Sequence, residues 1–300
     1  MHRRVLLAGL LALGACGNDK MHEHRDGPIG PAYWQPKPGE TKNWDIQVNA
    51  PIDLAETRAM MIVDLWASVP AATTIDYGGG APVSVPAGAN ATTIATLQAR
   101  QTQVICRVGL GGAKTTDPDF SKFPAGALSP MTLDDDGATH FLDFAQRDTW
   151  EDIAFARVDL AKQIGCDGIE PYLSDHGQID LGVAPTFESQ QSWYAAVALA
   201  VHERELSVGM RNGLNIGLVD TQTGNYDWLL VERCGEDENC ELVRPFLNAR
   251  KAVFAIDYTT DFEGNDQQAA PLCAQQTIGN VQDGLVKDIA LSSAFRMQCQ

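Results

Sequence analysis

Carboxylates close several apolar segments that have the composition of buried strands. Asp64 follows Met-Met-Ile-Val, Glu170 closes Asp-Gly-Ile-Glu, Glu232 closes Leu-Leu-Val-Glu, and Asp257 follows Val-Phe-Ala-Ile. Burying one carboxylate beside an apolar strand costs free energy. Several carboxylates at equivalent places therefore indicate a functional cleft, where perturbed titratable groups tend to gather.

Two carboxyl groups on either side of a sugar-sized cleft are able to hydrolyse a glycosidic bond. One group protonates the leaving oxygen, while the other attacks the anomeric carbon or activates a water molecule. Crowding of like charges raises one pKa, which keeps the acid protonated near neutral pH. Polar and aromatic side chains near the predicted strand ends are expected to bind the substrate, and Trp34 is expected to offer a flat apolar face to a sugar ring. The residues near strand ends are Asp64, Tyr172, Arg211, Asn212, Asp257 and Tyr258.

The elements that would position these residues alternate between short Val- and Ile-rich runs and longer helical patterns, which implies parallel strands with helical crossovers. The predicted strands are Trp44–Val48, Met60–Trp66, Gln103–Val108, His140–Phe144, Gly168–Pro171, Leu206–Arg211, Asp227–Glu232 and Ala252–Tyr258. The predicted helices are Thr92–Arg100, Trp150–Ile164, Phe187–Glu205 and Glu241–Lys251. Eight such strands predict an α/β fold, a single-domain (β/α)8 TIM barrel whose strand ends converge on one face.

The N-terminus resembles a bacterial lipoprotein signal. A basic start and a short apolar run precede Leu13-Gly14-Ala15-Cys16, as in a secretory signal with a lipobox. We expect residues 1–15 to be the signal peptide, 16–31 a flexible tether and 32–300 the barrel domain. Lipidation of Cys16 would anchor the exported chain to the membrane of the bacterial cell envelope, on its periplasmic or cell-surface side. An ordinary secretory signal is the alternative.

Net charge and the spacing of cysteine and histidine limit the ligands that the chain is expected to bind. The net charge of -17 excludes nucleic-acid binding through phosphate neutralisation. No cysteine or histidine spacing indicates a metal site, and no motif indicates a cofactor. An even number of cysteines after Cys16 suggests disulfides in an exported protein. Cys234 and Cys240 flank a short polar loop and form the safest pair. Cys273–Cys299 would fasten the C-terminal tail, which leaves Cys106–Cys166.

A series of short motifs covers the chain from about Ala32 to the C-terminus. They are Trp34-Gln-Pro-Lys-Pro-Gly39 with Trp44 and Gln47, Ile62-Val-Asp-Leu-Trp66, Val104-Ile-Cys106, Phe141-Leu-Asp-Phe144, Cys166-Asp-Gly-Ile-Glu-Pro171, Ser207-Val-Gly-Met-Arg-Asn212, Val231-Glu-Arg-Cys234 with Cys240, and Val253-Phe-Ala-Ile-Asp-Tyr258. Their order and spacing resemble glycoside hydrolase family 114. The resemblance implies a β/α barrel that hydrolyses α-1,4-linked polygalactosamine, a polymer that is cationic where it is not acetylated.

The chain departs from the family pattern at one catalytic position. Members of the family typically continue Glu-Pro with Asp-Asn, and that Asp is thought to be catalytic. Here Tyr172 and Leu173 follow Glu170-Pro171. The opposite family carboxylate is matched by Glu232. We therefore expect Glu170 or Asp175 to act as its partner in a glycoside hydrolase of extracellular polysaccharide. The alternative is a non-catalytic polysaccharide-binding lipoprotein with a degenerate site.

Overall fold

The computed structural model describes residues 32–49, 51–78, 81–133, 137–172, 180–214, 216–259 and 266–299. The chain divides into two units, Met1–Ala32 and Tyr33–Gln300, and the fold described here is that of the second. In the parts that the structure describes, no helix is long and apolar enough to cross a membrane.

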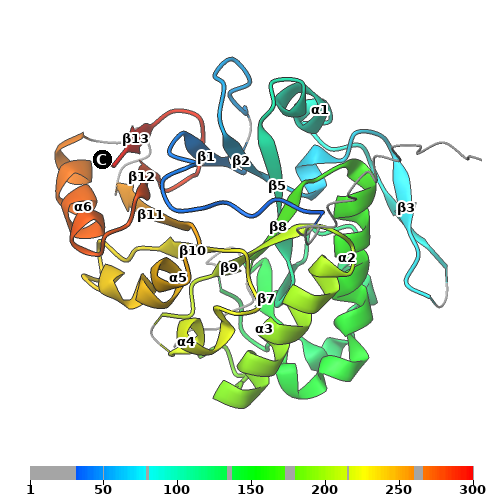
Figure 1. The fold of residues 1–300 in the computed structure, drawn as a ribbon. Helices are drawn as coiled ribbons and strands as arrows, with labels where there is room; N and C mark the ends of the chain where they lie inside the picture. The colour runs from blue at the N-terminus through cyan, green and yellow to red at the C-terminus, as the bar shows by residue number, and fades with distance from the viewer. Residues whose placement is uncertain are drawn as a thin grey trace, which may run out of the picture. The chain divides into compact units, whose positions relative to one another are not determined.

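A nine-stranded sheet curves into a nearly closed barrel (Figure 1). Its parallel strands, in spatial order, are β1 (Trp44–Gln47), β2 (Met60–Asp64), β5 (Gln103–Gly109), β8 (Gly168–Tyr172), β9 (Ser207–Arg211), β10 (Trp228–Glu232), β11 (Val253–Thr259) and β12 (Asp283–Asp288). Strand β13 (Arg296–Gln298) pairs antiparallel with β12, and Arg296 donates to the carbonyl oxygen of Trp44 in β1. The C-terminal strand thus helps to join the two edges of the sheet.

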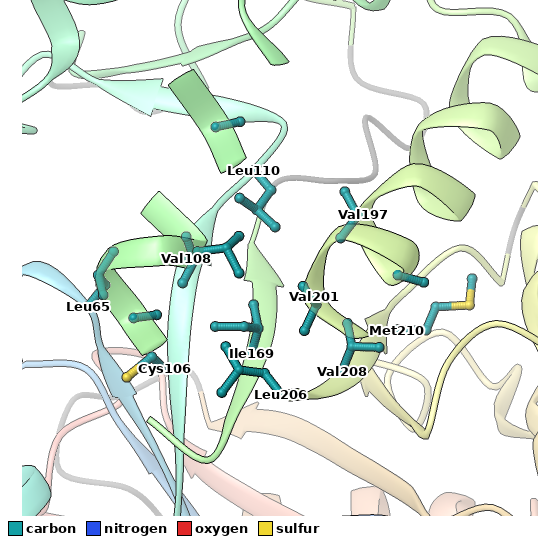
Figure 2. Close-up of a cluster of buried hydrophobic side chains, with 14 of the residues drawn as sticks. Leu65, Cys106, Val108, Leu110, Ile169, Val197, Val201, Leu206, Val208 and Met210 are labelled. Atoms are coloured by element: carbon teal, nitrogen blue, oxygen red, sulfur yellow. The ribbon is translucent and has the colours of Figure 1, made fainter. Parts of the chain in front are cut away.

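Helices cover the outside of the barrel. They are α1 (Thr93–Gln98), α2 (Glu151–Ile164), α3 (Phe187–His202), α4 (Leu218–Gln222), α5 (Arg244–Asn248) and α6 (Asp266–Ile278). Helix α2 packs on β5, while α3 packs on β8 and β9. The contact is apolar: side chains of these strands, such as Val108, Ile169 and Val208, lie with Val197 and Val201 of α3 in one buried cluster (Figure 2).

A second apolar cluster fills the interior of the barrel with side chains from alternate strand positions, including Trp44, Ile62, Trp228 and Phe254. Trp228 requires a glycine opposite it. A Cβ atom on Gly209 would lie 2.2 Å from the indole ring. The ring therefore fills the space that the side chain of any other residue at position 209 would need. The clusters on the two faces show which positions of each strand point inward, since successive side chains alternate.

Two of the sequence predictions for the elements were wrong. The segment predicted as the strand His140–Phe144 belongs instead to β7 (Thr139–Phe141), which forms a hairpin with β6 (Gly112–Lys114) outside the main sheet. The eighth parallel strand is β12, which was not predicted. Its charged residues Asp283, Lys287 and Asp288 are all fully buried, and Lys287 pairs with Asp45 at 3.0 Å. Because of these charged residues, the segment has no apolar run from which a buried strand could be predicted.

Three disulfides fasten the barrel, in the pairs expected from the sequence: Cys106–Cys166, Cys234–Cys240 and Cys273–Cys299. The first joins β5 to the residues just before β8. The second closes a loop after β10. The third links α6 to the C-terminal tail next to β13.

Replacing Cys106 and Cys166 by Ala should destabilise the chain more than replacing Cys234 and Cys240. The first bridge spans 60 positions and the second only 6. The loop-entropy relation gives a loss of about 4 kcal/mol for the first and about 2 kcal/mol for the second. Urea unfolding of both double variants beside the parent measures the difference. Equal losses would contradict this account.

Candidate functional site

The inward positions at the C-terminal ends of the strands surround a cavity of about 600 Å³. Ile169, Met210 and Val231 pack outward against the helices. Their neighbours Glu170, Tyr172, Arg211 and Glu232 therefore face the barrel axis, together with Arg107 and Tyr258. All of these except the fully buried Glu170 line the cavity. This is the face where barrel enzymes carry their active sites.

Glu170 lies beneath the cavity and is fully buried. Nε of Arg107 donates to its Oε2 at 2.7 Å, and Nη1 of Arg211 pairs with its Oε1. Both carboxylate oxygens are thereby held by cations from the two neighbouring strands. The prediction that Glu170 acts directly on a substrate does not fit this geometry. Its position suits a residue that fixes the two guanidinium groups.

Glu232 is the carboxylate that reaches the cavity. Its Oε2 pairs with Nη2 of Arg211 and accepts from Nδ2 of Asn212 at 3.4 Å, while its Oε1 accepts from the hydroxyl of Tyr258. Burial raises its pKa, but Arg211, Arg107 and these hydrogen bonds outweigh that effect and lower the pKa to about 2. Glu232 is therefore ionised at any ordinary pH, as a nucleophile or a general base must be.

Tyr258 and Asn212 position Glu232. Burial raises the pKa of Tyr258 well above its ordinary value, and the negative charge of Glu232 adds to the effect. The phenol therefore stays protonated and donates a hydrogen bond. Asn212 adopts the left-handed conformation with φ of 51°, which asparagine tolerates better than most residues. Its Oδ1 accepts from the backbone N–H of Glu232 at 2.9 Å.

Tyr172 lies over the cations that hold Glu170. The centre of its ring is 4.9 Å from Cζ of Arg107 and 4.8 Å from Cζ of Arg211, distances at which a cation and an aromatic face attract. Nζ of Lys114 lies 6.0 Å from the same ring. Tyr172 is thus packed on the two guanidinium groups that pair with Glu170.

A second cavity of about 150 Å³ adjoins the first and shares Arg107, Lys114 and Tyr172 with it. Its own lining includes Asp64 and Asp117. Burial raises the pKa of Asp64 above its ordinary value, and the charge of Asp117 adds to the effect, although the backbone N–H of Ala67 and the charge of Arg107 oppose it. Asp64 therefore has the opposite tendency to Glu232.

Arg157 holds the loop that carries Asp117. Its guanidinium is fully buried and bonds Asp119 with two nitrogens at 2.7 and 2.8 Å, the carbonyl oxygen of Gly109 at 2.7 Å, and Asp117 at 3.1 Å. Helix α2, which carries Arg157, thus fixes the end of β5 and the start of the connection between β6 and β7. The wall of the second cavity depends on this contact.

Two predicted substrate-binding residues lie away from both cavities. Asp257 points outward from β11 and accepts hydrogen bonds from the backbone of Gly235 and Glu236 and from Gln276. It orders the disulfide-bonded loop after β10. Trp34 packs on the interior cluster that contains Trp44 and Trp228, the first residues of β1 and β10, and therefore lies at the opposite ends of the strands.

Of the other predicted site residues, five line a cavity and two lie outside the described part of the chain. Asp64, Tyr172, Arg211, Asn212 and Tyr258 all line one of the two cavities. Asp175 and Cys16 lie outside the described residues. Among the residues that are described, no group of three or more His, Cys, Asp or Glu side chains is arranged to hold a metal ion.

Sequence reasoning missed Arg107, Lys114 and Asp117. Arg107 follows the apolar run Val104-Ile-Cys106 near the end of a predicted strand, so the rule that found the carboxylates applies to it equally. Lys114 and Asp117 come from the loop and hairpin after β5. No strand-end pattern marks such residues, because only the folding of the loop brings them to the barrel axis.

The sequence profile of glycoside-hydrolase family GH114 matches residues 26–300. The chain belongs to this family. Among solved structures, Ega3 of Aspergillus fumigatus in complex with galactosamine matches with 25% identity and a TM-score of 0.71, over 91% of this chain and all of that one. The glycoside hydrolase domain of PelA from Pseudomonas aeruginosa matches with 14% identity and a TM-score of 0.61, over 86% of this chain and 98% of that one.

These matches confirm the family resemblance and the barrel-like fold. At 14% sequence identity, the likeness to the PelA domain supports the fold alone. No curated protein sequence matches the chain. Membership of GH114 makes the cavity above the barrel the expected site of glycosidic chemistry.

Replacing Glu170 by Gln should destabilise this GH114 member by about 3–5 kcal/mol, because the buried charges of Arg107 and Arg211 would lose their shared partner. Glu236→Gln is the matched control. It breaks the half-exposed pair with Arg233, which is worth less than about 1 kcal/mol. Chemical unfolding of both variants gives the comparison. A Glu170→Gln variant as stable as the control would show that the buried pairs do not hold the site.

Proposed function

We propose that the chain hydrolyses a galactosamine-containing extracellular polysaccharide, with Glu232 as the ionised catalytic carboxylate. The observation that carries the proposal is the place of Glu232, which lines the cavity at the strand ends while Arg211, Asn212 and Tyr258 hold its carboxylate oxygens. These partners also lower its pKa to about 2. Membership of GH114 supports the reaction class. The likeness to Ega3, solved with galactosamine, supports the sugar.

The proton donor in this proposal is Asp64. Strands β2 and β10 lie four places apart in the order of the barrel, so Asp64 and Glu232 approach the axis from opposite sides. Their surroundings raise one pKa and lower the other, which is the pattern of an acid–base pair. Asp64 would protonate the leaving oxygen, and Glu232 would attack the anomeric carbon or activate water. Asp175 is the competing donor.

One observation favours a second function, the binding of polysaccharide without hydrolysis. Tyr172 stands where the family resemblance leads us to expect a catalytic Asp, and its ring covers Arg107 and Arg211. Glu170, the nearest carboxylate in the sequence, is enclosed by the same cations. A receptor of this kind would bind the glycan and release no reducing ends.

Reducing-end release from galactosamine polymers distinguishes the two functions. We expect Glu232→Gln and Asp64→Asn each to lower kcat/KM by about 100- to 10,000-fold, the usual contribution of a general acid or base. Asp175→Asn tests the competing donor. Glu188→Gln and Asp220→Asn, at exposed positions of α3 and α4, are the matched controls. Parent activity that survives Glu232→Gln would refute the catalytic role, and no release by the parent would favour the receptor.

The dependence of activity on pH tests which of the two carboxyl groups acts ionised and which acts protonated. Activity requires Glu232 ionised, so it should rise as the pH increases through about 2. It also requires Asp64 protonated, so it should fall as the pH rises through the raised pKa of that group. In any residual activity of Asp64→Asn the falling limb should be absent. Its persistence there would assign the proton to another group.

We also propose that the chain is exported and carries a lipid on Cys16. The basic start, short apolar run and Leu13-Gly14-Ala15-Cys16 support the signal. The three disulfides support an oxidising compartment. A lipid anchor would hold the barrel where extracellular polysaccharide is found.

Labelling with radioactive palmitate in a bacterial host tests the anchor. The parent chain should take up label and sediment with membranes, whereas Cys16→Ala should do neither, because the acylated thiol is gone. The double variant Cys234→Ala/Cys240→Ala should keep the label. Label retained by Cys16→Ala would refute the assignment.

A further inference from the structure

The loop that follows β10 begins with a backbone conformation that few residues other than glycine adopt. Arg233, the residue directly after Glu232, has a φ of 60°. This left-handed conformation costs an arginine free energy, and strain of this kind tends to gather at functional sites. The turn of the chain at Arg233 comes immediately after the proposed catalytic carboxylate. The strain therefore indicates a role for the direction that this turn gives to the side chain of Arg233.

The side chain of Arg233 lies over the ring of Tyr258. The Cζ atom of Arg233 is 5.3 Å from the centre of this ring, a distance at which a cation and an aromatic face attract each other. Both residues line the larger cavity. The hydroxyl of the same ring donates a hydrogen bond to Oε1 of Glu232. Arg233 thus packs on the residue that holds one oxygen of the proposed catalytic carboxylate.

The guanidinium group of Arg233 is itself held by the loop. Its Nη1 pairs with Oε2 of Glu236 at 2.5 Å. The backbone N–H of Glu236 donates to Oδ1 of Asp257 at 3.0 Å, and the N–H of Gly235 donates to the same oxygen at 3.1 Å. A Cβ atom on Gly235 would lie 2.6 Å from Oδ2 of Asp257. The loop therefore approaches this fully buried carboxylate closely because position 235 is a glycine.

These contacts form a closed ring that begins and ends on β11. Asp257 and Tyr258 are neighbours in this strand, and successive side chains point to opposite faces. Asp257 holds the backbone of Glu236, and Glu236 pairs with Arg233. Arg233 then lies on the ring of Tyr258. The disulfide Cys234–Cys240 closes the loop that carries Glu236. The place of the Tyr258 ring therefore depends on this loop as well as on its own strand.

We propose that Arg233 is a positioning residue, which keeps the ring of Tyr258 where its hydroxyl donates to Glu232. This inference rests on the proposed hydrolysis and adds to it a residue that acts through another side chain. Without the hydroxyl, Glu232 keeps Arg211 and Asn212 on Oε2 but loses the partner of Oε1. The carboxylate is then free to turn away from the orientation in which it acts, so the loss falls on kcat.

A double-mutant cycle tests this role, with reducing-end release from galactosamine polymers by the full chain as the assay. Arg233→Asn removes the guanidinium group, while asparagine tolerates the left-handed backbone. We expect kcat to fall about two- to fivefold, the factor that corresponds to a cation–π contact at an exposed site, with KM nearly unchanged. In a Tyr258→Phe background the same substitution should have no effect, because the hydroxyl is already gone. Arg233→Lys, which keeps a cation, should retain most of the parent kcat.

Arg250→Asn is the matched control. Arg250 is exposed just after α5, has a φ of 57° and lines neither cavity, so the same substitution there should leave kcat unchanged. Crystal structures of both variants give a readout that does not depend on hydrolysis. In Arg233→Asn the hydroxyl of Tyr258 should be displaced from Glu232 or divided between two conformers. In Arg250→Asn it should stay on Glu232.

The outcomes separate this inference from the proposed function. Hydrolysis by the parent with an unchanged kcat for Arg233→Asn, or with an equal loss in both backgrounds, would overturn the inference and uphold the function. A rise in KM that persists in the Tyr258→Phe background would overturn it too, because Arg233 would then bind substrate directly. If the parent does not hydrolyse the polymer, the function fails and the crystal structures decide the positioning role. A hydroxyl that stays on Glu232 in Arg233→Asn would refute that role, and a displaced hydroxyl would support it.

Discussion

The ion pairs of Glu170 with Arg107 and Arg211 determine the arrangement of the rest of the site. Three neighbouring strands each place one of these side chains on the inner face of the barrel, and the carboxylate is fully buried between the two cations. The carboxylate has no exposed surface, while Arg107 and Arg211 are 8% and 5% exposed, toward the cavity. Arg211 also reaches Glu232, and both guanidinium groups support the ring of Tyr172.

This arrangement decides which carboxylates are available for chemistry. Glu170 lies within β8 and Glu232 ends β10, and the first is enclosed by cations while the second opens into the cavity. Tyr172 covers the guanidinium groups that hold Glu170. On the opposite side of the barrel, burial raises the pKa of Asp64. Burial also raises the pKa of Asp117, which lines the same cavity as Asp64. The carboxyl groups around the axis thus differ in their surroundings.

The charges around the cavity are paired locally, whatever the net charge of the chain. The chain carries -17 overall, which favours the approach of cationic polymers at long range. At the cavity, Arg107 and Arg211 pair with Glu170, and Arg211 also pairs with Glu232. Arg233 pairs with Glu236. Composition therefore bears on how a substrate approaches, while these pairs fix the side chains that it meets.

The sequence by itself determined seven of the barrel strands, because runs such as Met60–Val63 and Val253–Ile256 are apolar on both faces, and it determined that polar residues meet at their ends. Only the tertiary structure identified β12, whose buried Lys287 is paired with Asp45, a residue distant in the chain. It also showed that Glu170 and Glu232 have different surroundings. Both have the same local pattern, and the partners that distinguish them come from other strands, which no single segment encodes.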